Sequence, residues 1–138
     1  MSHDKMLAAE LAIGMVVHLC PKTLLGKGAK PNGPPAQWVE GHHFFICVDA
    51  GPKRCVMLPL FSNGSAERQA LSVNGRSGHE KWTGGTFHFY PWQTWTASRD
   101  TIAQSARAGG DLSRSGSRNL LDPKLTPPLP TAPHSTSS

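Results

Sequence analysis

The sequence predicts a mainly β protein with one small domain. Short runs rich in β-branched and aromatic residues alternate with turns that contain glycine, proline and asparagine. Helical patterns are confined to residues 4–11 and 98–108. Hydrophobic residues make up 38% of the chain and charged residues 17%, a composition that excludes a wholly disordered chain and a membrane protein.

The N-terminal part is expected to contain a short helix, a strand and a long loop. Asp4 is a suitable N-cap for a helix over residues 4–11. Residues 15–20 read MVVHLC and predict a first strand, which Pro21 ends. Residues 21–37 are rich in proline and glycine, and we expect a loop there without helix or sheet pairing.

The central prediction is a β-hairpin. Residues 42–49 and 54–61 are nearly continuous apolar runs that flank a turn at residues 50–53. Such strands are typical of a sheet covered on both faces, or of a small closed barrel. A further short strand is expected over residues 69–73, between two turn clusters.

Aromatic residues dominate the segment from residue 82 to residue 95. In this segment we expect Trp95 and Phe87 to be buried, because a small domain needs large rings for its core, and Trp92 to be exposed after Pro91. Ser98 is a good N-cap for the helix that follows the last expected strand.

The C-terminal segment is expected to stay outside the domain. Residues 111–138 are basic at first and then rich in serine and proline, with few large apolar side chains. Such a segment cannot offset the entropy of ordering its backbone. The sequence therefore predicts a barrel domain at residues 1–110 and a flexible tail at residues 111–138, disordered from residue 122 onward.

The chain shows no secretion signal and no apolar run of the roughly 20 residues that a membrane helix needs. We therefore expect a soluble, cytoplasmic protein. Its three cysteines lack a CxxC spacing and are expected to be reduced, buried thiols. The histidines and cysteines show no zinc-binding spacing, so we expect neither a metal nor a cofactor.

The net charge of +5 suggests a polyanionic partner, since basic surfaces bind phosphate backbones with release of counterions. Lys22, Lys27 and Lys30 lie in the predicted loop and are candidates for phosphate contacts, although a solvated charged loop is the common alternative. The aromatic segment can likewise serve as a platform for unpaired bases or only as core.

The order of segments resembles that of the PemK/MazF family of toxin components, over roughly residues 12–108. The segments that carry the resemblance are a strand at 14–20, a long loop at 21–37, a hairpin at 42–61 that ends in a Pro-x-x-Ser turn at Pro59 and Ser62, and a strand through Gln93 and Thr94 into a helix. The resemblance implies an SH3-like barrel, a homodimer, an antitoxin as protein partner and cleavage of RNA without metal.

Two positions differ from the family pattern. Phe61 stands where the family has a hydroxyl, and Ser62 follows one position later. The second strand begins with His42 and His43 in place of the family's basic residues. Histidine suits acid or base catalysis near neutral pH, but neighbours on a strand point to opposite faces, so only one of the two can enter a site. The alternative is a strand-edge pair with one solvated ring.

These observations give an expected site and three hypotheses. The expected catalytic residues are His42, His43, Ser62 and Arg68. The expected nucleic-acid-binding residues are Lys22, Lys27, Lys30, Arg54 and Trp92. The leading hypothesis is a protein that binds nucleic acid, RNA rather than DNA, as a metal-independent endoribonuclease. The alternatives are a noncatalytic adaptor or inhibitor from a phage or mobile element, and a binder of double-stranded DNA.

Overall fold

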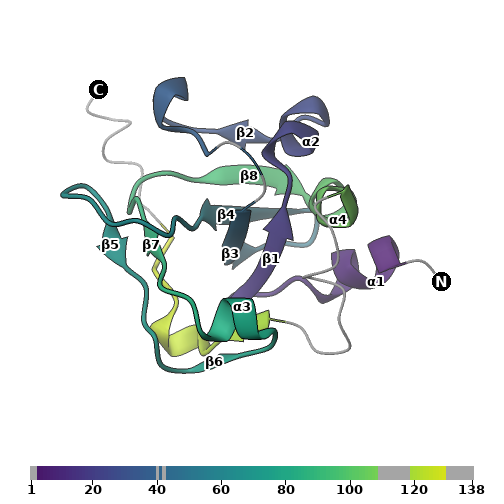
Figure 1. The fold of residues 1–138 in the computed structure, drawn as a ribbon. Helices are drawn as coiled ribbons and strands as arrows, with labels where there is room; N and C mark the ends of the chain where they lie inside the picture. The colour runs from purple at the N-terminus through teal and green to yellow at the C-terminus, as the bar shows by residue number, and fades with distance from the viewer. Residues whose placement is uncertain (1–2, 40, 42, 109–118, 130–138) are drawn as a thin grey trace.

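A seven-stranded antiparallel sheet forms the centre of the computed structural model, which describes residues 3–39, 41, 43–108 and 119–129 (Figure 1). The strands of this sheet, in spatial order, are β2 (Lys30–Pro31), β8 (Trp95–Ser98), β4 (Arg54–Pro59), β3 (His43–Ala50), β1 (Met15–Leu19), β9 (Asn119–Leu121) and β6 (Arg76–Ser77). A second sheet pairs β5 (Gln69–Ala70) with β7 (His88–Phe89). The helices are α1 (His3–Glu10), α2 (Pro21–Gly26), α3 (Glu80–Thr83) and α4 (Arg99–Ala108), with 3-10 turns at Pro35–Gln37 and Pro123–Leu125.

The mainly β prediction is confirmed, whereas the predicted barrel is not. The central sheet ends at β2 on one side and at β6 on the other, and within the described residues these two strands do not pair. The sheet is therefore open. In the same part of the chain, no helix has the length and apolar character that crossing a bilayer requires.

The β3–β4 hairpin is buried on both faces, as predicted. Phe45 and Cys47 point into a core beneath the helices, and Ile46 points into a second core on the opposite face. All three side chains are fully buried. A register shift between Cys47 and Asp49 marks a β-bulge near the turn. The hairpin thus separates two apolar layers.

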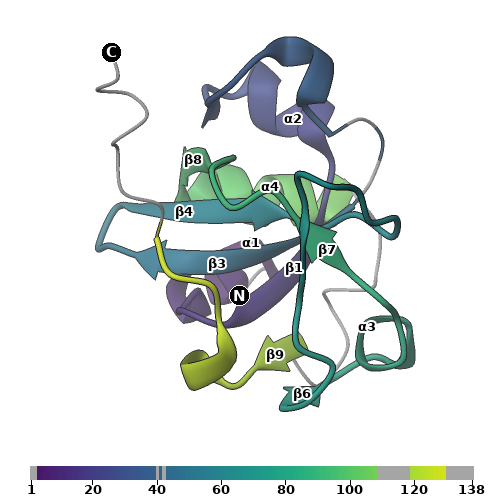
Figure 2. The same ribbon diagram turned by 90° about the vertical axis from the view of Figure 1, so that its left-hand side faces the viewer.

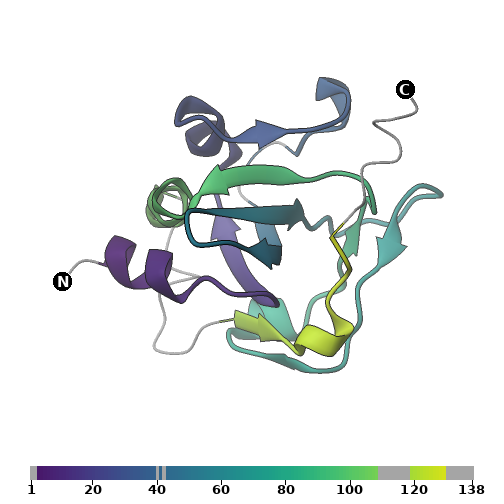
Figure 3. The ribbon, with the colours of Figure 1, turned by 180° about the vertical axis from the view of Figure 1, so that it is seen from behind.

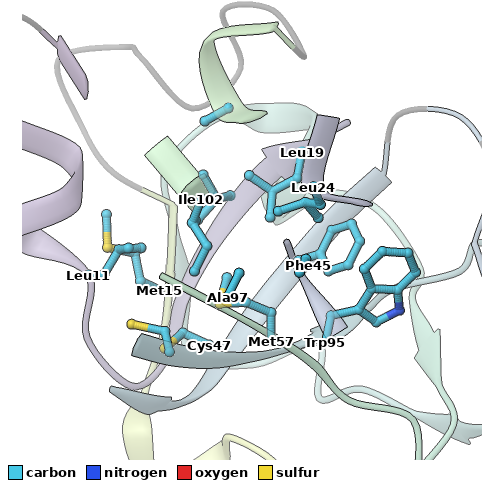
Figure 4. Close-up of a cluster of buried hydrophobic side chains, with 14 of the residues drawn as sticks. Leu11, Met15, Leu19, Leu24, Phe45, Cys47, Met57, Trp95, Ala97 and Ile102 are labelled. Atoms are coloured by element: carbon cyan, nitrogen blue, oxygen red, sulfur yellow. The ribbon is translucent and has the colours of Figure 1, made fainter. Parts of the chain in front are cut away.

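Helices α1 and α4 lie side by side on the first of these faces (Figures 1 and 3). The predicted cap is confirmed, because Ser98 Oγ accepts a hydrogen bond of 3.1 Å from the backbone N–H of Thr101. Ile102 is fully buried and lies with Leu19 and Leu24 near Phe45 (Figure 4). Arg99 holds the layers together, since its Nη1 donates to the carbonyls of Ala8 and Leu11 at the end of α1 and its Nε donates to the carbonyl of Gly51 in the hairpin turn.

Trp82 organises the second core, around the one-turn helix α3. It is fully buried against Phe44 and Phe87. The Arg76 guanidinium lies 4.5 Å from the Trp82 ring, and its Nη1 donates to the carbonyls of Trp82 and Gly85. Burial lowers the pKa of Arg76. Local sequence patterns predict neither α3 nor β6, because β6 pairs with the distant strand β9 and the Arg76 side chain satisfies the carbonyls of Trp82 and Gly85.

The prediction of a long loop without helix or sheet pairing at residues 21–37 is wrong. Pro21 occupies the first turn of α2, where a helix needs no N–H donor. Leu24 anchors this helix in the main core with 1% of its surface exposed. Ser105 Oγ holds the start of α2, accepting from the N–H of Cys20 at 2.9 Å and donating to its carbonyl at 2.8 Å. Pro31 lies on an edge strand, where its missing N–H breaks no ladder.

Residues 119–129 belong to the fold, contrary to the tail predicted over 111–138. Strand β9 pairs with β1 beside Met15, so the last described strand follows α4 rather than preceding it. Leu121 is 1% exposed, and Asp122 caps the turn at Pro123–Leu125. Composition misses this strand because its contacts are with distant residues: Asn119 Oδ1 accepts from the N–H of His79, and the carbonyl of Leu120 accepts from Trp82 Nε1. Figure 2 shows α2 at the top, beyond β8, and β9 at the bottom, beyond β3, so the two lie toward opposite edges of the central sheet. The predicted tail at 111–118 and 130–138 lies outside the described residues.

The docking of β9 can be tested with a matched pair of glycines. Gly14 (φ 92°) and Gly28 (φ 94°) both have left-handed backbone conformations, but a Cβ at Gly14 would collide with the carbonyl of Leu121, whereas a Cβ at Gly28 would meet nothing within 4 Å. Both alanine variants acquire backbone strain of about 1–2 kcal/mol. We expect Gly14→Ala to lower the free energy of unfolding by about 1–3 kcal/mol more than Gly28→Ala in urea titrations. Equal losses would contradict the pairing of β9 with β1.

Candidate functional site

Several strands end or begin at one end of the central sheet. The registers place Leu19 opposite His43 and Pro59 opposite Phe45, so that β1 and β4 end where β3 begins. The chain after β4 and the chain before β8 meet at this end. We call the side chains gathered there the Phe61 cluster, whose members are His43, Phe61, Arg68, His88, Tyr90 and Trp92.

Arg68 supplies a fixed positive charge in the Phe61 cluster. The central carbon of its guanidinium lies 4.0 Å from the centre of the Phe61 ring and 4.9 Å from that of Tyr90. Nη1 donates a hydrogen bond of 2.7 Å to the carbonyl of Asn63, which ties the arginine to the exposed turn after β4. Nε is buried and has no hydrogen-bond partner among the described residues. These contacts with two aromatic rings and a backbone carbonyl hold the guanidinium in place at this end of the sheet.

His43 has its tautomer fixed by the backbone. Its Nδ1 lies 2.9 Å from the carbonyl oxygen of Leu60. Because a carbonyl only accepts hydrogen bonds, Nδ1 must carry the proton, and Nε2 holds the lone pair when the ring is neutral. The ring is partly exposed and its centre lies 5.5 Å from that of Phe61. His42, the other histidine proposed from the sequence, lies outside the described residues.

His88 joins the Phe61 cluster from the second sheet. It forms an antiparallel bridge with Phe61, with backbone hydrogen bonds of 2.7 and 2.8 Å. Its Nδ1 is buried without a hydrogen-bond partner among the described residues. Its Nε2 edge faces Gly64, since a Cβ there would lie 3.0 Å from Nε2. Sequence reasoning considers His88 only as a metal ligand, because no local pattern pairs it with Phe61.

Trp92 is half-buried rather than exposed as predicted. Its ring packs on Tyr90, with 5.2 Å between ring centres, and on Gly33, where a Cβ would collide with it. The Asn32 side chain donates to the carbonyl of Trp92 at 2.8 Å. Trp92 is therefore part of the support for the Phe61 cluster and offers only part of its ring to a ligand. The predicted burial is confirmed for Trp95, which is 1% exposed, whereas Phe87 is only partly buried.

The structure divides the remaining predicted residues between the two ends of the sheet. Ser62 is exposed and directly follows Phe61. Lys30 is exposed on the edge strand β2, where it lies opposite Thr96 of β8 and in the row of Val56. Lys22 is exposed at the start of α2. Lys27 is exposed at the end of that helix, where its carbonyl lies beside Thr101 of α4.

Arg54 lies at the far end of the sheet. It begins β4 opposite Ser98, and the extended chain from there to Phe61 covers about 20 Å. Of the two arginines predicted for the site, only Arg68 therefore contacts the ring of Phe61, which His43 also contacts.

The far end of the sheet also holds an open groove of about 500 Å³, lined by Ala8, Ala9, Pro52, Lys53, Ser98, Arg99 and Asp100. Arg99 in this groove donates to three backbone carbonyls. Its guanidinium therefore holds α1, α4 and the hairpin turn together, and we assign it a structural role.

Metal ligands do not gather in the described part of the chain. No group of three histidine, cysteine, aspartate or glutamate side chains is placed there to hold a metal ion. The groups that the Phe61 cluster does present are imidazole, guanidinium and phenol hydroxyl.

The three cysteines are free thiols with different surroundings. Cys47 and Cys55 are fully buried, and a hydrogen bond with the Cys55 thiol together with burial raises the pKa of Cys47. Cys20 is partly exposed where β1 meets α2. Burial acts to raise the pKa of Cys20, but hydrogen bonds from Thr23 and the backbone of Lys22 and the Lys22 charge outweigh it, so its pKa is lowered.

These surroundings predict selective alkylation. The thiolate is the reactive form, so a lowered pKa and partial exposure make Cys20 the preferred target of iodoacetamide in the folded protein. We expect mass spectrometry at pH 7.5 to find one carbamidomethyl group, on Cys20, and three after unfolding in guanidinium chloride. If Cys47 in the folded protein were labelled as fast as Cys20, the result would contradict the burial of Cys47.

Comparison with known proteins does not assign the chain to a family: no model of a protein family, no curated protein and no solved structure matches it.

Proposed function

We propose that this protein is a PemK/MazF-like RNA-binding protein that cleaves single-stranded RNA without a metal ion, using the Phe61 cluster. The observation that carries the proposal is that a histidine of fixed tautomer and a guanidinium contact the same ring, Phe61, at one end of the sheet. The order of strand, hairpin and helix that resembles this family supports the assignment.

His43 is the proposed base. Cleavage of RNA by its own 2′-hydroxyl requires removal of the hydroxyl proton as oxygen attacks phosphorus. The hydrogen bond from Nδ1 to Leu60 leaves the lone pair of the neutral ring on Nε2 and fixes the direction in which it points. This arrangement matches the general rule that a catalytic histidine is oriented through its second nitrogen.

Arg68 is the proposed stabiliser of the phosphorane. Negative charge accumulates on the nonbridging oxygens during attack, and a preorganised cation is most effective there. Stacking on Phe61 and Tyr90 and the bond to Asn63 hold the guanidinium in place before substrate binds. Ser62, exposed beside Phe61, is placed to position the phosphate with its hydroxyl.

RNA is favoured over DNA because the proposed reaction uses the 2′-hydroxyl. Single strands are favoured because a base must leave its stack to contact the partly exposed Trp92 ring. Lys22, exposed at the start of α2, and Lys30, exposed on β2, are proposed contacts for phosphates farther along the strand. An acidic protein would complement the positive charge of this chain, so we propose an antitoxin of that kind as the physiological inhibitor. From the family resemblance we also propose a homodimer as the active form.

Phe61 favours a second candidate function. It stands where the resembled family has a hydroxyl, so a chain that binds RNA or a nucleoprotein through this surface without cleaving it would act as an adaptor. Binding and cleavage therefore need to be measured separately.

Cleavage is tested by incubating the purified protein with a long unstructured RNA in EDTA. We expect fragments with 2′,3′-cyclic phosphate and 5′-hydroxyl ends, and a loss of about 10²–10⁴-fold in rate for His43→Ala. Arg68→Gln should lose activity to a similar degree, because it removes the cation. The matched control is His79→Asn, which keeps a capping side chain at α3, far from the Phe61 cluster.

The outcome separates the candidate functions. RNA that stays intact at excess protein but binds with a steep dependence on salt supports the adaptor and rejects the nuclease. RNA that neither binds nor breaks at low salt rejects both. Unchanged activity in His43→Ala would remove His43 as the base.

A further inference from the structure

We propose that His88 is the general acid that protonates the leaving 5′-oxygen, on the opposite side of the phosphate from His43. This inference rests on the proposed function and assigns a second catalytic residue to the same site. The strand pairing around Phe61 aligns His43 and His88 on either side of that residue.

This alignment follows from the registers. Continuing the β3–β4 pairing by two residues beyond Phe45 and Pro59 places His43 opposite Phe61. Phe61 in turn is bridged to His88. Directly opposed residues in antiparallel strands project from the same face, and neighbouring strands lie about 4.8 Å apart. His43 and His88 therefore flank Phe61 on one face, with backbones about 10 Å apart.

In-line attack at phosphorus calls for groups arranged in this way. The attacking and leaving oxygens lie on opposite sides of the phosphorus, so a base and an acid that serve them must stand on opposite sides of the phosphate as well. Arg68 lies over the ring of Phe61, the residue that stands between the two histidines in the strand pairing, and is the proposed stabiliser of the phosphorane charge.

The surroundings of His88 indicate which nitrogen acts. The buried Nδ1 cannot reach a ligand, whereas Nε2 faces Gly64 in the exposed turn that follows β4. The hydrogen bond from Arg68 to Asn63 holds the adjacent part of this turn. Because Nδ1 is buried, we assign Nε2, on the ring edge that packs against Gly64 of this exposed turn, as the nitrogen that donates the proton.

The reaction balances without a further reagent. The 2′-oxygen forms a bond to phosphorus as its proton passes to Nε2 of His43. The bond from phosphorus to the 5′-oxygen breaks as that oxygen takes the proton from Nε2 of protonated His88. The products are a 2′,3′-cyclic phosphate and a 5′-hydroxyl, with the two histidines left in exchanged protonation states.

Substrates with different leaving groups test this assignment. A dinucleotide has a strongly basic leaving oxygen that needs an acid, whereas uridine 3′-(4-nitrophenyl phosphate) releases a weakly basic phenolate that does not. We expect His88→Ala to lose about 10²–10⁴-fold in kcat/KM on the dinucleotide and at most a few-fold on the nitrophenyl ester. The kcat/KM of His43→Ala should fall on both substrates, because the base is needed for each.

Controls keep the test decisive. His88→Gln is measured beside His88→Ala, with thermal melts to show that both are folded, and His79→Asn serves as the histidine control. If the folded His88 variants lose kcat/KM equally on the two substrates, or lose none on either, the assignment of His88 is overturned and the proposed nuclease is left intact. A wild-type protein that cleaves neither substrate overturns both proposals.

Discussion

Burial of both faces of the β3–β4 hairpin is the constraint around which the fold is arranged. A strand whose successive side chains Phe44, Phe45 and Ile46 are all apolar must be covered on two sides. One side is covered by α1 and α4, and the other by the Trp82 core. The helices and the α3 loop are separated in the chain, yet both are placed by this one pair of strands.

The candidate site is a product of the same arrangement. The hairpin strands reach the end of the sheet at this site, and the side chains there are less buried than those of the core. Phe61 is almost covered, whereas His43 and Arg68 are partly exposed. Polar groups at this boundary are fixed by the rigid sheet and still meet solvent. Strand register places His43, whereas Arg68 lies just before β5 and is held by its contacts with Phe61, Tyr90 and Asn63.

The sequence predicts features that depend on neighbouring residues and misses those that depend on distant ones. The hairpin and α4 were predictable because an apolar run and the Ser98 cap are local signals. Helix α2 was not predictable, because a proline can end a strand or occupy the first turn of a helix, and the residue type of Pro21 does not distinguish the two. His43 and Arg68 were identified from residue type, but the pairing of His88 with Phe61 has no signature in the sequence of either segment.

The position of β9 has a consequence for biosynthesis. Its partner β1 is made early, and the backbone groups on the open side of β1 stay unpaired until residues 119–121 have left the ribosome. An open edge of apolar strand invites association with other chains. Nascent polypeptides that stall after α4 would therefore expose the edge of an otherwise assembled sheet, and would depend on chaperones to remain unaggregated.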